Sequence, residues 1–189
     1  MTSATGHAMT PDLVGALFEE VDNTLAPLSE PADLLVVGGA ALLLRWDPAR
    51  VTYDVDVVTP LPAAVEDAAA VVAARYGLSP FWLNSGTLVA RPAGLEPDEA
   101  LVVHAGKNLT VSVAGPRYLL AMKVFAGRGT DRSDLLHLFG PAAVDSLDAV
   151  YALHSEAYPG LRLHAAAERT LQDAWADYTK SRASGRDGR

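Results

Sequence analysis

The sequence predicts an α+β fold, in which a small mixed β-sheet with flanking helices is followed by a C-terminal helical region. Two observations support this prediction. Apolar and β-branched runs of strand length occur only in the first 115 residues, where they alternate with helical patterns. From Gly115 onward every patterned segment has helical spacing. The expected divisions are a core over residues 1–115, a helical region over 116–178 and a disordered basic tail over 179–189.

Helical and strand patterns alternate along the first half of the core. Leu13, Leu17 and Val21 form one apolar stripe, which predicts a helix over residues 11–24. The Ala-rich run that precedes Gly77 predicts another helix. The predicted elements are therefore helices over 11–24, 40–46 and 63–75 and strands over 32–39 and 50–58.

The rest of the core contains three further strand candidates, and the remaining chain is predicted to be helical. The candidates lie around residues 81–90, over 100–106 and over 108–113. The last two are expected to form a hairpin that turns near Gly106 to Asn108. The C-terminal helices are expected over 116–127, 131–140, 142–158 and 164–180.

Composition excludes several classes of protein. The chain has no cysteine, so neither disulfides nor a thiolate metal site can contribute. No apolar run reaches the length of a membrane span and the N-terminus lacks a secretory pattern, so we expect a cytoplasmic protein with no membrane partner. The net charge of −8 argues against a surface that coats nucleic acid. The tail, with four basic residues and one acidic residue, is either a solvated terminus or a local RNA contact.

Two aspartates, Asp54 and Asp56, are embedded in the predicted strand over 50–58. Side chains two residues apart in a strand point to the same face, so the two carboxylates are expected to project together. Carboxylates this close repel each other unless a cation lies between them. Mg²⁺ is commonly held by one or two carboxylates together with substrate phosphates. The pair therefore predicts a site for metal-bound phosphate.

Gly38 and Gly39 stand between the predicted strand over 32–39 and the helix that follows it. Glycine lets a backbone approach an anion closely, and the first N–H groups of a helix point toward such an anion. Each feature alone has a structural explanation, since a tight turn needs glycine and an edge strand can carry exposed aspartates. Their combination at this spacing predicts a nucleotide and metal site.

Residues 38–58 resemble the first motif of the nucleotidyltransferase superfamily, which has a DNA polymerase β-like palm. The resemblance is closest to the AbiEii/MenT-type toxin branch of bacterial toxin–antitoxin systems. The matching positions in this sequence are Gly38, Gly39, Arg50, Thr52, Asp54 and Asp56.

Residues 120–136 resemble the second motif of the same branch. Lys123 lies among apolar residues of a predicted helix, where an ammonium group needs a partner, and a nucleotide phosphate is one candidate. A lysine that reaches solvent at the helix margin is the alternative. Thr130 is a good N-cap for the next helix, with two aspartates in its first turn. The matching positions are Lys123, Arg128, Asp131, Asp134 and Leu135.

The resemblance implies a metal-dependent nucleotidyltransferase that uses an NTP substrate and Mg²⁺, with Mn²⁺ as an alternative. It implies metal ligation by Asp54 and Asp56 and nucleotide binding by Gly38, Gly39, Arg50, Thr52, Lys123 and Arg128. Asp131 would activate the acceptor hydroxyl, supported by Asp134. It also implies a tRNA 3′ end as acceptor and a cognate antitoxin as partner.

Two departures from the superfamily pattern keep other functions open. Ala40 stands where a Ser or Thr usually follows the glycines, and the strand candidates over 100–113 contain no third carboxylate. A non-catalytic nucleotidyltransferase-like module, serving as an antitoxin or binding partner, is therefore a second hypothesis. Transfer to a protein is a third. The five histidines show no zinc-ligand spacing, and the three tryptophans are interpreted as packing residues.

Overall fold

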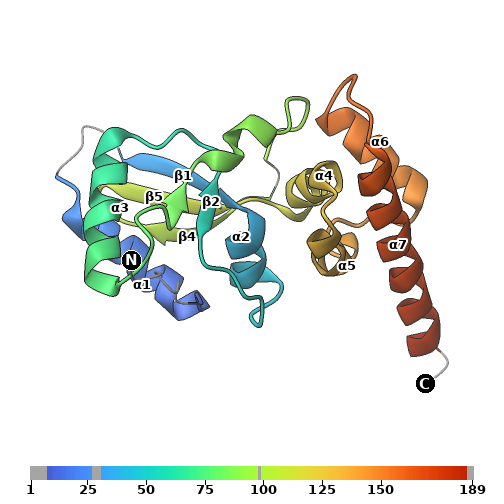
Figure 1. The fold of residues 1–189 in the computed structure, drawn as a ribbon, viewed down its shortest axis with the longest axis horizontal. Coiled ribbons are helices and arrows are strands. Elements are labelled where there is room, and N and C mark those ends of the chain that lie inside the picture. The colour runs from blue at the N-terminus through green and yellow to red at the C-terminus, as the bar shows by residue number, and fades with distance from the viewer. Residues whose placement is uncertain (1–7, 27–30, 98, 187–189) are drawn as a thin grey trace, which may run out of the picture. The chain divides into compact units, whose positions relative to one another are not determined.

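The computed structural model describes residues 8–26, 31–97 and 99–186 (Figure 1). The chain forms two compact units. The first, called the sheet unit, comprises Met1–Val89 and Ala100–Ala114; the second, called the helical unit, comprises Ala90–Glu99 and Gly115–Arg189. The α+β fold predicted from the sequence is confirmed, with a mixed sheet, flanking helices and a C-terminal helical region.

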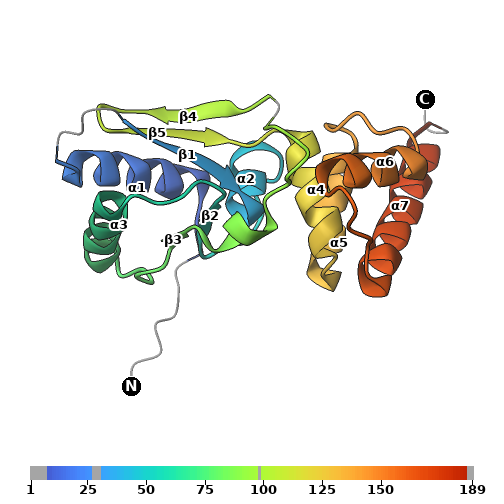
Figure 2. The same ribbon diagram turned by 90° about the horizontal axis from the view of Figure 1, so that it is seen from above.

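The sheet unit is built on five strands in the order β3-β2-β1-β5-β4. β1 runs antiparallel to β2 and parallel to β5, β2 runs parallel to β3, and β4 and β5 form the predicted hairpin (Figure 2). The strands are β1 Ala32–Val37, β2 Val55–Val57, β3 Leu83–Asn84, β4 Leu101–Ala105 and β5 Leu109–Val113.

The three helices of the sheet unit are close to their predicted positions. They are α1 Pro11–Thr24, α2 Gly38–Arg45 and α3 Ala63–Tyr76. The Thr10 side chain caps α1 by accepting from the Leu13 N–H, and Gly77 ends α3 in the left-handed region. α1 packs against α3 and against β4 and β5, which covers one face of the sheet.

Alternation along the strands separates a buried face from a partly exposed face. Leu34, Val36, Val111 and Val113 are buried beneath the helices, whereas Asp33 is exposed on the opposite face. Thr110 and Ser112 of β5 and Leu35 of β1 are half-buried on that opposite face. The sheet therefore presents a partly open, polar surface on the side away from α1.

Asp22 of α1 fixes the β4–β5 hairpin to the helix. Its buried carboxylate accepts hydrogen bonds from the backbone N–H groups of Lys107, at 3.0 Å, and Asn108, at 2.6 Å. His104 Nε2 lies 3.8 Å from the same carboxylate. At Gly106 an added Cβ would lie 2.1 Å from an Asp22 oxygen, so the close approach requires glycine. The polar cluster thus specifies the hairpin register.

The helical unit contains four α-helices and one 3₁₀ turn among the described residues. The segment from Ala90 joins this unit, because the Tyr158 hydroxyl donates to the Ala90 carbonyl and the Gly94 N–H donates to Ala157. The sequence analysis had assigned these residues to the core. The elements are α4 Pro116–Ala126, η2 Gly129–Asp131, α5 Arg132–Phe139, α6 Leu147–Ala157 and α7 Ala165–Arg186.

Four sequence predictions about secondary structure are wrong. The helix expected over 142–158 begins only at Leu147, because residues 141–146 form turns and irregular backbone. β2 is limited to Val55–Val57 rather than residues 50–58, because the preceding residues form a loop. Residues 87–90 belong to the 3₁₀ helix Gly86–Ala90 rather than to a strand. Residues 179–186, predicted to be disordered, continue α7, and the last three residues of the predicted tail lie outside the described part of the chain. Among the described residues, no helix combines the length and apolar character needed to span a membrane.

His154 of α6 lies in the core of the helical unit, with 4% of its surface exposed. Its ring stacks near Phe125 and Tyr158, and its Nε2 atom has no hydrogen-bond partner among the described residues. Burial lowers the pKa of His154 below its ordinary value of 6.5, because the charged imidazolium is poorly solvated there. The folded state therefore holds this side chain neutral.

We expect the free energy of unfolding to fall as the pH drops from 7.5 to 5.5, because His154 takes up a proton more readily in the unfolded chain. One such group changes the stability by at most about 1.4 kcal/mol per pH unit. Urea unfolding at several pH values should show a smaller loss in His154→Leu. His137→Gln, at an exposed histidine, should keep the wild-type pH dependence. Equal pH profiles for wild type and His154→Leu would contradict the assignment.

Candidate functional site

The turn from β1 into α2 leads into a helix whose first backbone N–H groups have no partner within the helix. Gly38 has φ +67°, in the left-handed region that favours glycine. Val37 is the N-cap residue and provides no side-chain cap, and the first turn of α2 has no acidic residue. The first N–H groups of this eight-residue helix are therefore suited to an anion.

Asp56 lies directly against this turn. The β1–β2 register pairs Asp56 with Val37, the residue before Gly38. A Cβ built on Gly38 would lie 2.8 Å from Asp56 Oδ2, so the carboxylate occupies the space that a side chain would need. Thr52 is close to the second glycine in the same way, since a Cβ on Gly39 would lie 2.8 Å from its hydroxyl oxygen. A Cβ at either glycine would thus force the polar group that packs on it to move.

Asp54 is exposed and immediately precedes β2, while Asp56 is half-buried within it. The buried Thr52 hydroxyl lies 3.2 Å from Asp54 Oδ1 and 3.2 Å from its carbonyl oxygen, and it donates toward both. Val55 and Val57 point into the core, so Asp56 is on the opposite, partly open side. Asp56 contacts the glycine turn directly, whereas Asp54 is linked to it through Thr52.

The donor set at this turn fits a hard divalent cation. Two carboxylates and a hydroxyl are oxygen ligands, which Mg²⁺ prefers, and phosphates and water commonly complete its shell. Within residues 8–26, 31–97 and 99–186, no group of three or more His, Cys, Asp or Glu side chains could hold a metal by itself. The chain therefore supplies a partial ligand set of the kind that a metal–nucleotide complex completes.

Asn84 is a neighbour of the aspartate pair that the sequence analysis missed. The parallel pairing of β2 and β3 places Asn84 opposite Asp56, so the two side chains share a face of the sheet. Asn84 Oδ1 accepts from the Gly86 N–H at 2.9 Å. The sequence pattern used for metal ligands consists of carboxylates and does not include the amide of Asn84. In addition, the two-residue strand β3 is too short to give a clear alternation of apolar and polar residues.

The second motif forms a buried ionic cluster in the helical unit. Lys123 Nζ lies 2.8 Å from Asp131 Oδ1 and 2.8 Å from Asp134 Oδ2. The side chains of the two aspartates are 4% and 2% exposed, and that of the lysine is 14% exposed. Such a cluster is stable only when its charges are paired and hydrogen-bonded. The partner that the sequence analysis required for Lys123 is supplied here by the two aspartates.

The local fold brings these residues together through two tight turns. Gly127 ends α4 with φ +54°, and a Cβ there would lie 2.1 Å from Ala167 of α7. The chain then enters η2, where Asp131 Oδ2 accepts from the Arg128 N–H at 3.0 Å. Thr130 is not the N-cap of α5; that position is held by Asp131, whose carboxylate bonds Lys123 and the Arg128 backbone instead of capping the helix.

The two remaining predicted residues are arginines. The Arg128 side chain is exposed, and its backbone N–H donates to Asp131. Arg50 is half-buried in the loop between α2 and β2, where its N–H donates to the Asp47 carbonyl at 2.9 Å. The predicted site residues thus form two clusters: one in the sheet unit around Gly38, and one in the helical unit around Lys123.

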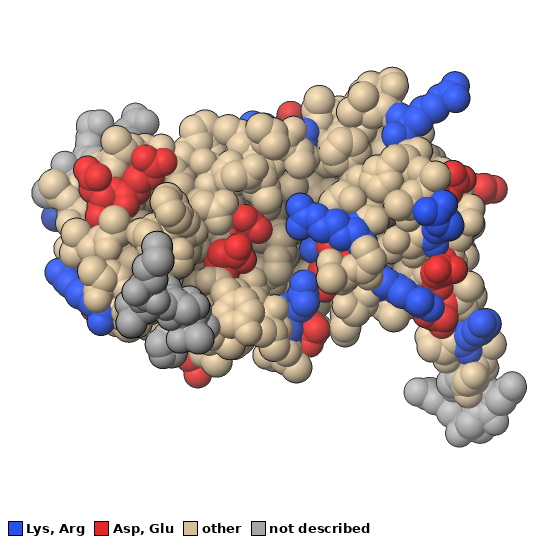
Figure 3. Space-filling view, in the orientation of Figure 1, with Lys and Arg blue, Asp and Glu red and all other residues tan. Residues whose placement is uncertain are grey.

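The two units differ in charge. The sheet unit has eleven acidic and four basic residues, whereas the helical unit has twelve acidic and eleven basic residues. On the face shown in Figure 3, Lys and Arg side chains are accordingly more frequent over α4–α7 than over the sheet unit. A polyphosphate at the acidic sheet unit would need a cation to offset repulsion from the carboxylates.

Replacing Gly38 by alanine should destabilise the protein for two reasons: the left-handed backbone and displacement of Asp56. Gly77→Ala is a matched control, because Gly77 has φ +66° and no atom within 4 Å of an added Cβ. The backbone alone costs about 1–2 kcal/mol. Urea unfolding should show a larger loss for Gly38→Ala than for Gly77→Ala. Equal losses would show that Asp56 does not constrain Gly38.

Replacing Lys123 by methionine should lower the free energy of unfolding by about 3 kcal/mol, since it leaves two buried carboxylates without their cation. Lys180→Met, at an exposed position of α7, should change it by less than about 0.5 kcal/mol. Adding Asp134→Asn to Lys123→Met should recover part of the loss. An unchanged urea midpoint for Lys123→Met would contradict the ionic cluster.

Comparison with known proteins gives one match. The model of a family described as a nucleotidyltransferase of unknown function (DUF6036) matches residues 14–182. No curated protein and no solved structure matches the chain. The matched residues include both motif clusters and nearly the whole chain, and the protein therefore belongs to this nucleotidyltransferase family.

Proposed function

We propose that the protein transfers a nucleotide from an NTP to an acceptor hydroxyl in a metal-dependent reaction. One observation supports this proposal above the others. The Asp56 carboxylate packs against the Gly38–Gly39 turn, where the N–H groups of α2 begin. This arrangement combines a metal-ligating oxygen with a phosphate-binding helix terminus in one place.

The residues of the sheet unit would bind the NTP phosphates. The backbone at Gly38 and Gly39, with the first N–H groups of α2, would cradle the triphosphate. Asp54 and Asp56 would hold Mg²⁺ or Mn²⁺, with Thr52 fixing Asp54 through its hydroxyl. The bound cation would offset negative charge on the phosphates.

In the reaction, the oxygen of the acceptor hydroxyl attacks the α-phosphorus of the NTP. The bond from the α-phosphorus to the oxygen that bridges to the β-phosphate breaks, pyrophosphate leaves with that oxygen, and the hydroxyl proton passes to a base or to water. Because little covalent chemistry is required of the protein, its contribution is to position the groups and stabilise charge.

Lys123 would neutralise charge on the nucleotide, together with Arg50 or Arg128. Its ammonium is already held in place by Asp131 and Asp134, so it is oriented before any ligand arrives. Asp131 accepts hydrogen bonds through both oxygens, one from Lys123 and one from the Arg128 N–H. This geometry favours a positioning role for Asp131 over the general-base role expected from the resemblance.

The acceptor and biological role rest on the motif resemblance. The order of the two motifs resembles the AbiEii/MenT-type branch, and on that basis we propose the 3′ end of tRNA as acceptor, growth arrest as outcome and a cognate antitoxin as partner. Transfer to a Ser, Thr or Tyr of a partner protein is the alternative enzymatic function.

A non-catalytic nucleotide-binding module is the second candidate. Two observations favour it: Ala40 provides no hydroxyl after the glycines, and the oxygens of Asp131 are both engaged. Such a module would bind the metal–NTP complex without transferring a nucleotide.

Nucleotide binding can be tested separately from catalysis. Calorimetric titration with each NTP should show binding that requires Mg²⁺ or Mn²⁺. Asp56→Asn should weaken it more than about 100-fold, since changes one shell further from a metal already cost about 10–100-fold. Asp33→Asn, at an exposed carboxylate of β1, should bind like the wild type. Binding that survives Asp56→Asn would reject this metal and nucleotide site.

Transfer is tested with α-labelled NTPs, Mg²⁺, total tRNA and lysate protein, with Asp56→Asn as the inactive reference. Label in tRNA supports the proposed acceptor, and label in protein supports the alternative one. NTP binding without label in either fraction supports the non-catalytic module.

A further inference from the structure

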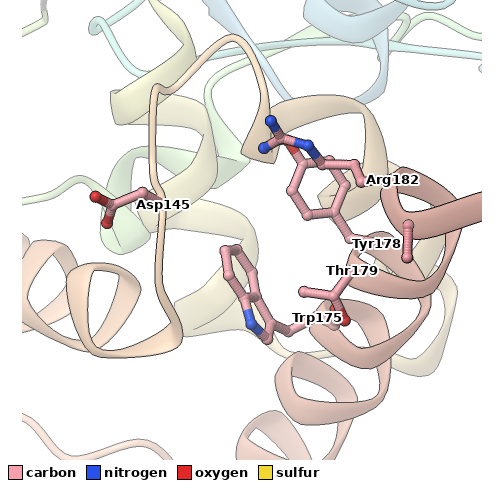
Figure 4. A pocket seen from close by; sticks show the side chains of 6 residues that line it. Asp145, Trp175, Tyr178, Thr179 and Arg182 are labelled. Carbon is pink, nitrogen blue, oxygen red and sulfur yellow. The ribbon is translucent and has the colours of Figure 1, made fainter. Parts of the chain in front are cut away.

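The helical unit has a small open pocket on the C-terminal half of α7, away from both motif clusters in sequence. Its volume is about 240 Å³. Two aromatic rings form part of its wall, and Asp145 borders it on the other side (Figure 4). The lining residues are Asp145, Trp175, Tyr178, Thr179, Arg182 and Ala183.

The aromatic wall is rigidly supported. Trp175 and Tyr178 are three residues apart on α7, so both project from one side of the helix. Phe139 of α5 packs behind them, with ring centroids 5.0 Å from Trp175 in an edge-on arrangement and 5.2 Å from Tyr178. The Trp175 and Tyr178 rings are 5.5 Å apart. Packing on the core side fixes the rings, while both side chains remain half-buried at the pocket.

A cation lies beside the aromatic wall. Arg182 lies over the Tyr178 ring, 5.6 Å from its centroid, and its Nη1 is 3.4 Å from the Tyr178 hydroxyl. Asp145, in the segment before α6, borders the pocket on the other side, and its carboxylate points away from the rings (Figure 4). The pocket therefore offers stacking surfaces and a guanidinium to one planar group.

Two basic residues of α7 lie at or near the pocket. Arg182 lines it, and Lys180 precedes Arg182 by two residues in the same helix. A ligand with a planar ring and flanking negative charges matches this combination better than an apolar peptide does.

We propose that this pocket binds a base of a single-stranded nucleic acid, stacked on Trp175 and Tyr178, with Arg182 and Lys180 near its phosphates. Proteins that bind single strands combine aromatic platforms with basic residues in this way. The inference rests on the proposed function in that the bound strand would be the acceptor, but strand binding requires neither NTP nor metal.

The test measures fluorescence anisotropy of a labelled ten-nucleotide single-stranded RNA, without NTP, against an abasic oligomer of equal length. The wild type should bind the RNA at least about tenfold more tightly than the abasic oligomer, since stacking is worth about 1–3 kcal/mol per base. Tyr178→Leu should lose about tenfold, and Arg182→Gln should lose several-fold. Arg169→Gln, a matched change at an exposed position of α7, should stay within about twofold.

A second measurement does not depend on whether the Tyr178→Leu variant folds correctly. RNA binding should quench the fluorescence of Trp175, and the quenching should largely disappear in Trp175→Phe while binding remains. Equal affinity for RNA and the abasic oligomer would overturn the proposal, because it would show that no base is stacked. Equal losses of affinity in Arg182→Gln and Arg169→Gln would also overturn it, because they would show attraction to positive charge anywhere on the helix. Absence of RNA binding by the wild type would also overturn it.

Asp56→Ala separates this inference from the proposed function. This variant should bind RNA like the wild type, because Asp56 is not among the residues that line the pocket. RNA binding by the wild type with no NTP binding by the wild type would support the pocket and reject the nucleotide site. NTP binding by the wild type that depends on Asp56, with no RNA binding, would do the reverse.

Discussion

The pairing of β1 with β2 is the constraint on which the candidate site depends. A register that places Asp56 opposite Val37 sets a carboxylate against the turn at Gly38, where an added Cβ would displace it and where the backbone has φ +67°. A slip of one residue would turn Asp56 toward the core and Val55 toward solvent. The same register therefore keeps the core apolar and the polar face functional. α1 and α3 seal the opposite face, so the glycine turn stands on a rigid support.

In the helical unit, by contrast, the charged residues of the second motif are buried and paired with one another. Lys123 and its two aspartates form a network that is costly to desolvate and costly to break. Such a network fixes the position of the ammonium group, as the proposed contact with a nucleotide phosphate requires. Because both oxygens of Asp131 already accept hydrogen bonds, from Lys123 and from the Arg128 N–H, Asp131 is less available to accept a proton from an acceptor hydroxyl.

Much of the architecture was predictable, because helical spacing and glycine punctuation are local signals. The helices around Leu17 and Val72, the hairpin at Gly106 and the order of strands and helices follow from such signals. The wrong secondary-structure predictions concern segments whose local pattern is weak or whose conformation is set by packing against the rest of the protein. Residues 87–90 look β-prone yet form a 3₁₀ helix, and the basic segment after Thr179 looks disordered yet continues a helix that packs through Trp175 and Tyr178.

The sequence by itself determined the chemistry available: two aspartates at strand spacing, a Gly-Gly turn before a helix, and a lysine followed by two aspartates. These are properties of residue type and spacing along one element. Only the tertiary structure decided which groups meet. It paired Asn84 with Asp56 across two strands, gave Lys123 its carboxylate partners and placed Asp145 beside the aromatic side of α7. Such contacts depend on strand register and helix packing between distant segments, which no local pattern encodes.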